Sequence, residues 1–271
     1  MADYVAIQRS AHFNAGYTPT TDLSFAARMA TVPLLKEELP YIIQHLAVGF
    51  VKRAGRSNDS FELIGLQSLA PNKNYFVLPD GRWLCSYSPA FYRAHPFALR
   101  SDEQDKQLQL SIKSDCINDN PSETDIRFFE EDKTLTPRMQ EILKFLTESL
   151  RSREATLKLC NALQDAKLIV PWPISYTEAD ENNKPLARTL QGLYHIDSNA
   201  LGNLPAKELA GLNTCGALNI AYGQLFSEPR LKDLTKLQDG HRHWQDQQSK
   251  QNTPEPDLDD IFGNKDDLFS F

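Results

Sequence analysis

The strongest conformational signal in the chain begins at Thr136-Pro137, after a first half that consists mainly of strand and turn patterns. Threonine is a good helix N-cap, and proline is favoured in the first helical turn. The apolar residues that follow fall on one face of a helix: Met139, Ile142, Leu143, Leu146 and Leu150. The pattern predicts a helix from residue 137 and a change of character at about residue 134.

Residues before this point carry strand signals. The stretches "ELIGLQSL" (62–69) and "NYFVLPDGRWLCSY" (74–87) are rich in apolar and aromatic residues. Asp80-Gly81 lies within the second stretch and predicts a hairpin turn. "QLQLSIKS" (107–114) alternates like a half-buried strand, and a short helix is expected around 33–38, before Pro40.

Helical patterns dominate the second half. "SREATLKLCNALQDAKL" (152–168) predicts a second helix capped by Ser152, and three short helices are expected between 205 and 237. "LIVPWPISY" (168–176) and "ARTLQGLYHID" (187–197) are expected to be extended. The chain is therefore predicted to be an α+β protein with a strand-rich N-terminal half, a helical C-terminal half and a disordered acidic tail.

The predicted globular domain spans residues 1–240. It is either undivided or split into a strand-rich subdomain over 1–130 and a helical one over 131–240. Residues 241–271 hold seven acidic and three basic side chains and few apolar ones, so they are predicted to be a flexible acidic tail.

Two similar units, "LDDIFG" (258–263) and "KDDLFSF" (265–271), lie in this tail. Apolar anchors beside acidic residues suit a groove that has a basic rim. We therefore expect the units to dock onto a partner protein, through Asp259, Asp260, Ile261 and Phe262 and through Asp266, Asp267, Leu268 and Phe269.

Composition excludes several classes of function. The net charge of −7 argues against a nucleic-acid partner, and no apolar run is long enough for insertion into a membrane. The four cysteines are scattered without a CxxC pair, which disfavours a structural zinc site and is typical of reduced thiols. With no signal-peptide pattern at the start, a cytoplasmic location is expected, with no cofactor.

The window "PAFYRAHPFAL" (89–99) and the residues before it supply the candidate binding residues: Trp83, Tyr92, Arg93, His95 and Phe97. If the window is extended, Arg93 and His95 point the same way and can hold an anion or a carboxylate. The alternative has the aromatic rings packed inward, Arg93 paired with an acidic group and His95 bonded to a backbone carbonyl. This packing interpretation is favoured, because no base or nucleophile lies nearby in the sequence.

One enzyme alternative stays open. His195-x-Asp197, with His241 or His243 further on, has the spacing of the two-histidine, one-carboxylate set that holds non-haem iron. The sequence has no GxSxG motif of hydrolases, no GxxxxGK[ST] loop of nucleoside triphosphatases and no GxGxxG turn of dinucleotide-binding enzymes. The interpretation leans away from an enzyme, with neither catalytic residues nor a metal assigned.

Several stretches resemble a known family. "DGRWLCSYSPAFYRAHPFAL" (80–99) is similar to the "DGRW…PAY.RRYPF" stretch of the SapC-like proteins of Gram-negative bacteria. "PLLKEELP", "FVKR", "GLQSL…NYFV" and "LQGLYHIDSNALGNLPAKELAGLNTCGALNIAYGQLFS" match in the same order, so the resemblance covers roughly residues 30–235. His195 stands where the family commonly has arginine, and His95 where it often has tyrosine. Both departures weigh against roles in iron binding or proton transfer.

The resemblance implies a cytoplasmic accessory protein that acts through protein partners in nutrient uptake or peptide handling. Family members carry labels linked to surface-layer proteins and peptide transport. Their genes lie beside genes for uptake receptors and halogenase-like proteins. The products of these neighbouring genes are the expected partners. The resemblance implies no agreed catalytic residues.

Overall fold

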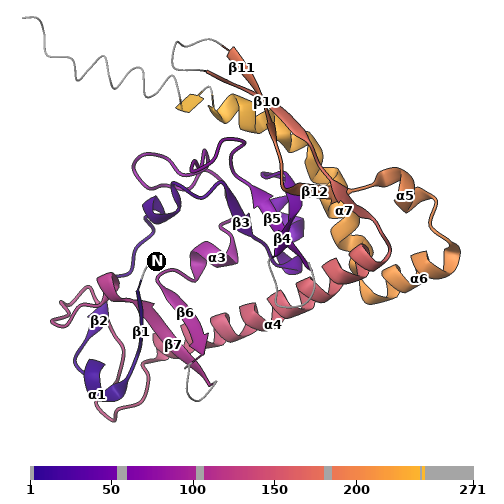
Figure 1. The fold of residues 1–271 in the computed structure, drawn as a ribbon. Helices are drawn as coiled ribbons and strands as arrows, with labels where there is room; N and C mark the ends of the chain where they lie inside the picture. Colours follow the sequence, from indigo (N-terminus) through magenta and orange to yellow (C-terminus); the bar gives the residue numbers. More distant parts are fainter. Residues whose placement is uncertain (1–2, 54–59, 102–106, 180–184, 239, 242–271) are drawn as a thin grey trace, which may run out of the picture.

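The computed structural model describes residues 3–53, 60–101, 107–179, 185–238 and 240–241. Strands predominate in the first half of the chain and helices in the second, so the predicted α+β class is confirmed (Figure 1). Of the predicted tail, only His241 belongs to the described residues. The flexible tail, His243 and the two Asp-Asp units lie outside them.

The largest sheet has five strands, and both halves of the chain contribute to it. Every neighbouring pair is antiparallel, in the order β3 (Thr31–Pro33), β5 (Ser60–Leu66), β4 (Val48–Arg53), β12 (Leu193–Ile196), β9 (Ile169–Pro171). The segments expected to be extended in the helical half therefore complete a sheet that begins in the first half.

A second sheet has three antiparallel strands, in the order β1 (Tyr4–Ala6), β7 (Leu108–Lys113), β6 (Phe97–Ser101). The strand expected over 107–114 is confirmed as β7. Because β6 pairs only with β7, its other side is a free edge within the described part of the chain. Two smaller pairs join β2 (Gly16–Tyr17) to β8 (Ile126–Arg127) and β10 (Ile174–Ala179) to β11 (Pro185–Leu190).

Helix α4 runs from Pro137 to Asp165 along the lower side of the molecule in Figure 1. The Thr136 side chain accepts a hydrogen bond from the Met139 N–H, as expected of a cap. The prediction of two helices was wrong, because neither glycine nor proline interrupts residues 138–165 and the helix continues through Ser152. Instead of capping a helix, the Ser152 hydroxyl donates to the Glu37 carboxylate.

The expected short helices are present in the second half as α6 (Ala206–Cys215), α7 (Ala217–Ser227) and a helical stretch over residues 231–238. Gly216, with a φ of 88°, separates α6 from α7 in the left-handed conformation that favours glycine. The other helices are short: α1 (Arg9–His12), α2 (Leu39–Ile42), α3 (Ala90–Arg93), α5 (Ser198–Gly202), and the 3-10 turns η1 (Ser24–Ala26), η2 (Lys36–Glu38), η3 (Ser114–Cys116) and η4 (Glu228–Arg230). Among the described helices, none has a stretch that is long and apolar enough to traverse a bilayer.

The turn expected at Asp80-Gly81 is present, but regular strands do not flank it. Gly81 has a φ of 82°, and a single bridge joins Val77 to Trp83. The Asp80 carboxylate accepts a hydrogen bond from the Arg82 N–H at 3.1 Å. Asparagine and aspartate side chains that bind nearby backbone in this way compete with a strand ladder.

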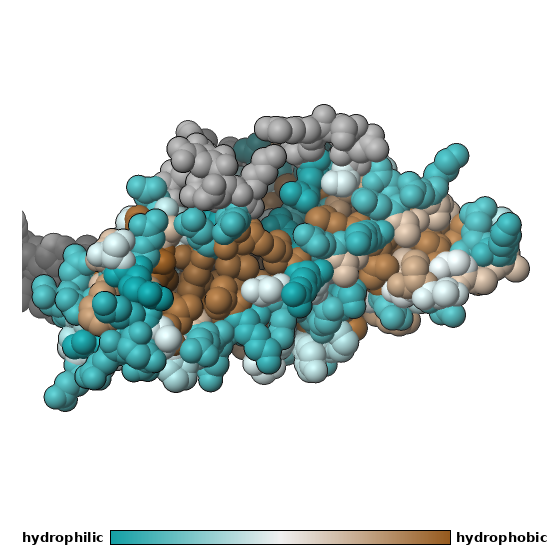
Figure 2. Space-filling view, turned by 90° about the horizontal axis from the view of Figure 1, so that it is seen from below, coloured by the Kyte–Doolittle hydropathy of each residue, from teal (hydrophilic) through white to brown (hydrophobic). Residues whose placement is uncertain are grey.

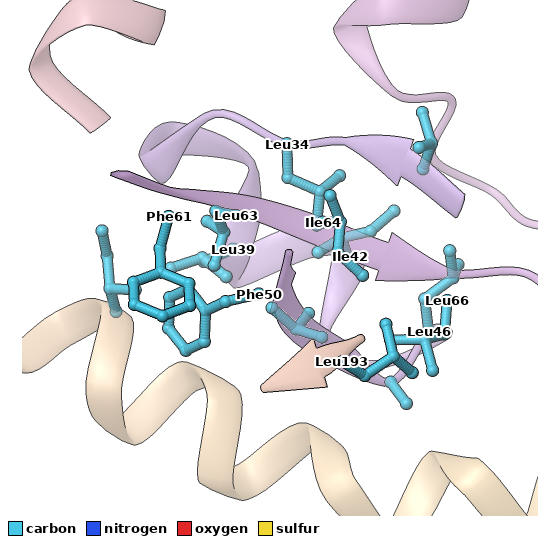
Figure 3. Close-up of a cluster of buried hydrophobic side chains, with 14 of the residues drawn as sticks. Leu34, Leu39, Ile42, Leu46, Phe50, Phe61, Leu63, Ile64, Leu66 and Leu193 are labelled. Carbon is cyan, nitrogen blue, oxygen red and sulfur yellow. The ribbon is translucent and has the colours of Figure 1, made fainter. Parts of the chain in front are cut away.

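Two hydrophobic clusters share α4. Met139 and Leu146 from its first half pack into a cluster with the three-stranded sheet, and Cys160 and Leu163 from its second half pack into the cluster of the five-stranded sheet. Beside the first half of α4 some hydrophobic surface remains uncovered, as the view from below in Figure 2 shows. Figure 3 shows the larger cluster, in which Phe50, Leu63 and Leu193 come from β4, β5 and β12.

Candidate functional site

The window Pro89–Leu99 is not extended at its centre. It forms α3, then a cis His95–Pro96 peptide bond, then the start of β6. Ala94 follows the helix in a helical conformation, so Arg93 and His95 do not alternate like strand residues. The extended conformation on which the anion-binding alternative depended is therefore not present.

Arg93 lies on the surface of α3 and contacts aromatic rings rather than an acidic group. Its guanidinium carbon is 5.5 Å from the centre of the Tyr87 ring and 5.0 Å from that of Phe145. Nε donates to the Ser88 carbonyl, and Nη2 donates to the Tyr87 hydroxyl at 3.1 Å. The side chain therefore fastens α3 to the preceding loop and to α4.

His95 is half-buried and stacks on Phe25, with ring centres 3.7 Å apart. The Lys113 ammonium lies 5.2 Å from the centre of the same Phe25 ring. Burial, and secondarily the charge of Lys113, lowers the pKa of His95 from 6.5 to about 4, so its ring is neutral near pH 7.

The remaining three candidates belong to the two hydrophobic clusters. Tyr92 is buried, and its hydroxyl donates to Gln67 Oε1 at 2.7 Å. Trp83 is partly buried with its ring 5.5 Å from that of Tyr92, and its Nε1 donates to the Tyr87 carbonyl. Phe97 is buried in the other cluster, with its ring edge-on to that of Tyr17 at 4.8 Å. The packing interpretation accounts for these three, whereas the neighbouring ring of Phe91 is 45% exposed.

Glu38 organises the loop before α3, although nothing in the sequence reasoning singled it out. It is 2% exposed, and its Oε1 accepts hydrogen bonds from the Ala90 N–H at 2.7 Å and the Tyr87 hydroxyl at 3.0 Å. Its Oε2 accepts from the Leu35 N–H at 2.8 Å. A glutamate three residues after a helix-start position is the one sequence signal that points to it.

An open groove of about 400 Å³ lies between α3, β6 and the first half of α4. We call it the α3–α4 groove. Its walls are mainly apolar, and they include Leu34, Phe91, Leu99, Leu146 and Leu150. His95 and Phe97 also line it, so the structure brings two of the five candidate residues to one surface.

The charges at the α3–α4 groove are positive. Lys113 and Arg153 line it, and no carboxylate does among the described residues. Arg153 is paired with Glu62, with 2.5 Å between Nη2 and Oε1. Because Phe97, Ala98 and Leu99 all line the groove, the free edge of β6 borders it. Pro33, Leu34 and Leu35, at and just after the end of β3, also line the groove. The surface therefore offers apolar contacts, the ammonium of Lys113, the paired guanidinium of Arg153 and a strand edge.

Among the described residues, His195, Asp197 and His241 do not form the iron-binding set that the alternative requires. His195 Nδ1 lies 2.9 Å from Glu228 Oε1, and its ring stacks on Trp172. Asp197 caps α5 by accepting from the N–H groups of Asn199 and Ala200. His241 lies against Tyr75, 2.9 Å from its carbonyl. No group of three or more histidine, cysteine or acidic side chains within the described ranges has the arrangement of a metal site.

The family model described as SapC matches residues 7–234, which is most of the 271-residue chain. No curated protein and no solved structure matches the chain.

Proposed function

Because this chain belongs to the SapC family, we propose that it is an accessory protein that binds an extended segment of a polypeptide partner in the α3–α4 groove. The proposed setting is the cytoplasm, in peptide handling or nutrient uptake. Products of neighbouring uptake or halogenase-like genes are the candidate partners.

The open apolar groove is the observation that carries this proposal. Monomeric proteins rarely expose large contiguous apolar surfaces, and such surfaces often mark a binding site. The groove volume of about 400 Å³ accommodates a few side chains rather than a whole domain. A short segment of a polypeptide fits this size better than a large globular surface.

The free edge of β6 favours an extended conformation for that segment. A peptide that adds a strand to a sheet edge gains main-chain hydrogen bonds, and every second side chain then points into the neighbouring hollow. The five residues of β6 span about 16 Å, enough to pair with a short strand.

The charges favour acidic residues in the segment. Lys113 faces a peptide in the groove, and Arg153 lies at the same surface with its guanidinium paired to Glu62. Buried apolar contacts provide most of the affinity, and the charges favour the correct partner. The preferred ligand is thus an extended peptide with apolar residues beside aspartate or glutamate.

Selection of random ten-residue peptides on the immobilised full-length protein tests the proposal. We expect enriched peptides to combine apolar and acidic residues. Their affinity for Leu150→Asp or Lys113→Glu should fall about tenfold or more, which corresponds to about 1.4 kcal/mol. Binding should also weaken at high salt.

Phe226→Asp is the matched control, because Phe226 is 70% exposed on α7 and does not line the groove. It should bind the same peptides as wild type. Failure to enrich any peptide, or equal losses in all three variants, would contradict the proposal. Thermal melting of each variant separates lost binding from lost folding, and Lys113→Glu changes no core residue.

The enzyme alternative has no observation in its favour among the described residues. His195, Asp197 and His241 are each held by separate partners. We therefore propose no catalytic activity.

A further inference from the structure

The last described residue, His241, lies against a loop residue, Tyr75, rather than in the α3–α4 groove. His241 contacts Tyr75, and the two residues line a second hollow, of about 360 Å³, together with Ser24 and Ala27. Phe25 and Met29, from the same segment as Ser24 and Ala27, line the α3–α4 groove. Residues 24–29 therefore contribute both to the hollow that contains His241 and to the α3–α4 groove.

The sequence beyond His241 is long enough to reach the groove. Sixteen residues, 242–257, separate His241 from the first Asp-Asp unit. An extended chain of that length spans about 50 Å, and a flexible one has a root-mean-square span of about 20 Å. A domain of this size has a radius of gyration of about 18 Å. The units are therefore within reach of the groove in the same molecule.

The chemistry of the two units complements the groove. Each unit places two aspartates before an aliphatic residue and a phenylalanine: Asp259, Asp260, Ile261 and Phe262, then Asp266, Asp267, Leu268 and Phe269. The groove supplies apolar walls, Lys113 and Arg153. Residues 257–271 thus have the composition that the proposed function assigns to the ligand of the groove.

We propose that residues 257–271 occupy the α3–α4 groove of their own chain, so that a partner must displace them. The inference rests on the proposed function, because it concerns the regulation of the same site. A tethered segment has an effective concentration near the millimolar range, so even a weak interaction keeps the groove covered. Because the tail carries two similar units, either one can occupy the groove.

Photo-crosslinking in the full-length protein tests this inference. A benzophenone amino acid replaces Phe269, and the dilute protein is irradiated and mapped by mass spectrometry. We expect crosslinks within one chain to peptides that contain residues 90–99 or 146–153. Lys113→Glu should reduce their yield severalfold, and so should Asp266→Asn combined with Asp267→Asn, which leaves the folded domain unchanged.

Phe226→Asp again serves as the control and should leave the crosslinks unchanged. Crosslinks that map elsewhere, that occur only between chains, or that ignore both charge variants would overturn the inference. Peptides from the selection experiment should also displace the crosslink when added in excess.

The two proposals fail in distinguishable ways. If selected peptides bind the groove while no crosslink to it forms, the inference fails and the proposed function stands. If the crosslink forms but no peptide is enriched even on the full-length Phe262→Ala, Phe269→Ala variant, the proposed function fails instead.

Discussion

At the scale of single residues, His95 shows how position changes the chemistry of a side chain. Burial against Phe25, and secondarily the charge of Lys113, keeps the ring neutral, with its pKa lowered from 6.5 to about 4. The unfolded chain takes up the proton near pH 6.5, whereas the folded protein takes it up only near pH 4. The contribution of neutral His95 to stability is therefore fully present above pH 6.5 and is lost as the pH falls toward 4.

We expect His95→Phe, which keeps an aromatic ring against Phe25, to lose less stability than wild type between pH 6.5 and 4. Urea unfolding across this range measures the difference. The carboxylates near His95, Asp22 and Asp115, are present in both proteins, so the two curves differ through His95 and its coupling to these carboxylates. Parallel curves for the two proteins would show that burial does not hold His95 neutral.

At the scale of elements, α4 ties the two hydrophobic clusters together through its length. Arg153 lies near the middle of this helix and pairs with Glu62. Proline in a helix interior removes a hydrogen bond and clashes with the preceding turn, at a cost of about 3 kcal/mol or more. Arg153→Pro should thus destabilise the protein by at least about 3 kcal/mol relative to Arg153→Ala.

The comparison with Arg153→Ala removes the contribution of the Glu62 ion pair, because both variants lose it. Urea unfolding measures the two free energies. If a second helix began at Ser152, proline at 153 would occupy the first helical turn and be tolerated. Equal stabilities would therefore contradict the continuous helix.

At the scale of the whole molecule, the cysteines report on the packing. Cys160 is fully buried where α4 meets the larger cluster, and burial raises the pKa of its thiol to about 12. Cys215 is exposed at the end of α6. Because the thiolate is the reactive form, burial and the raised pKa both protect Cys160.

A maleimide reagent should therefore label Cys215 in the native protein and Cys160 only when the molecule unfolds. Peptide mapping after timed labelling, with and without urea, measures both rates. Labelling of Cys160 should follow the fraction of unfolded molecules. Similar native rates for the two thiols would mean that the second half of α4 does not pack as described.

Features set by neighbouring residues were predictable from the sequence. The start of α4 at Pro137, strand β7 and the turn at Gly81 each depend on spacing, capping or backbone freedom within a few residues. Membership of the SapC family was also predictable from the sequence, because the motifs of the family are contiguous stretches. The helix start expected at Ser152 was wrong, because a residue that suits an N-cap does not interrupt a helix when the residues on both sides favour helix.

The tertiary structure alone decided which of these pieces meet. β12 pairs with β4 across more than one hundred residues, and Glu38 reaches Ala90 across 52. The α3–α4 groove combines the segments around residues 25–35, 90–99 and 146–153. Local pattern establishes that a side chain is apolar or charged, but the surface it shares depends on how distant elements pack. Local sequence patterns therefore fix the α+β class and the family, whereas the packing of distant segments forms the α3–α4 groove.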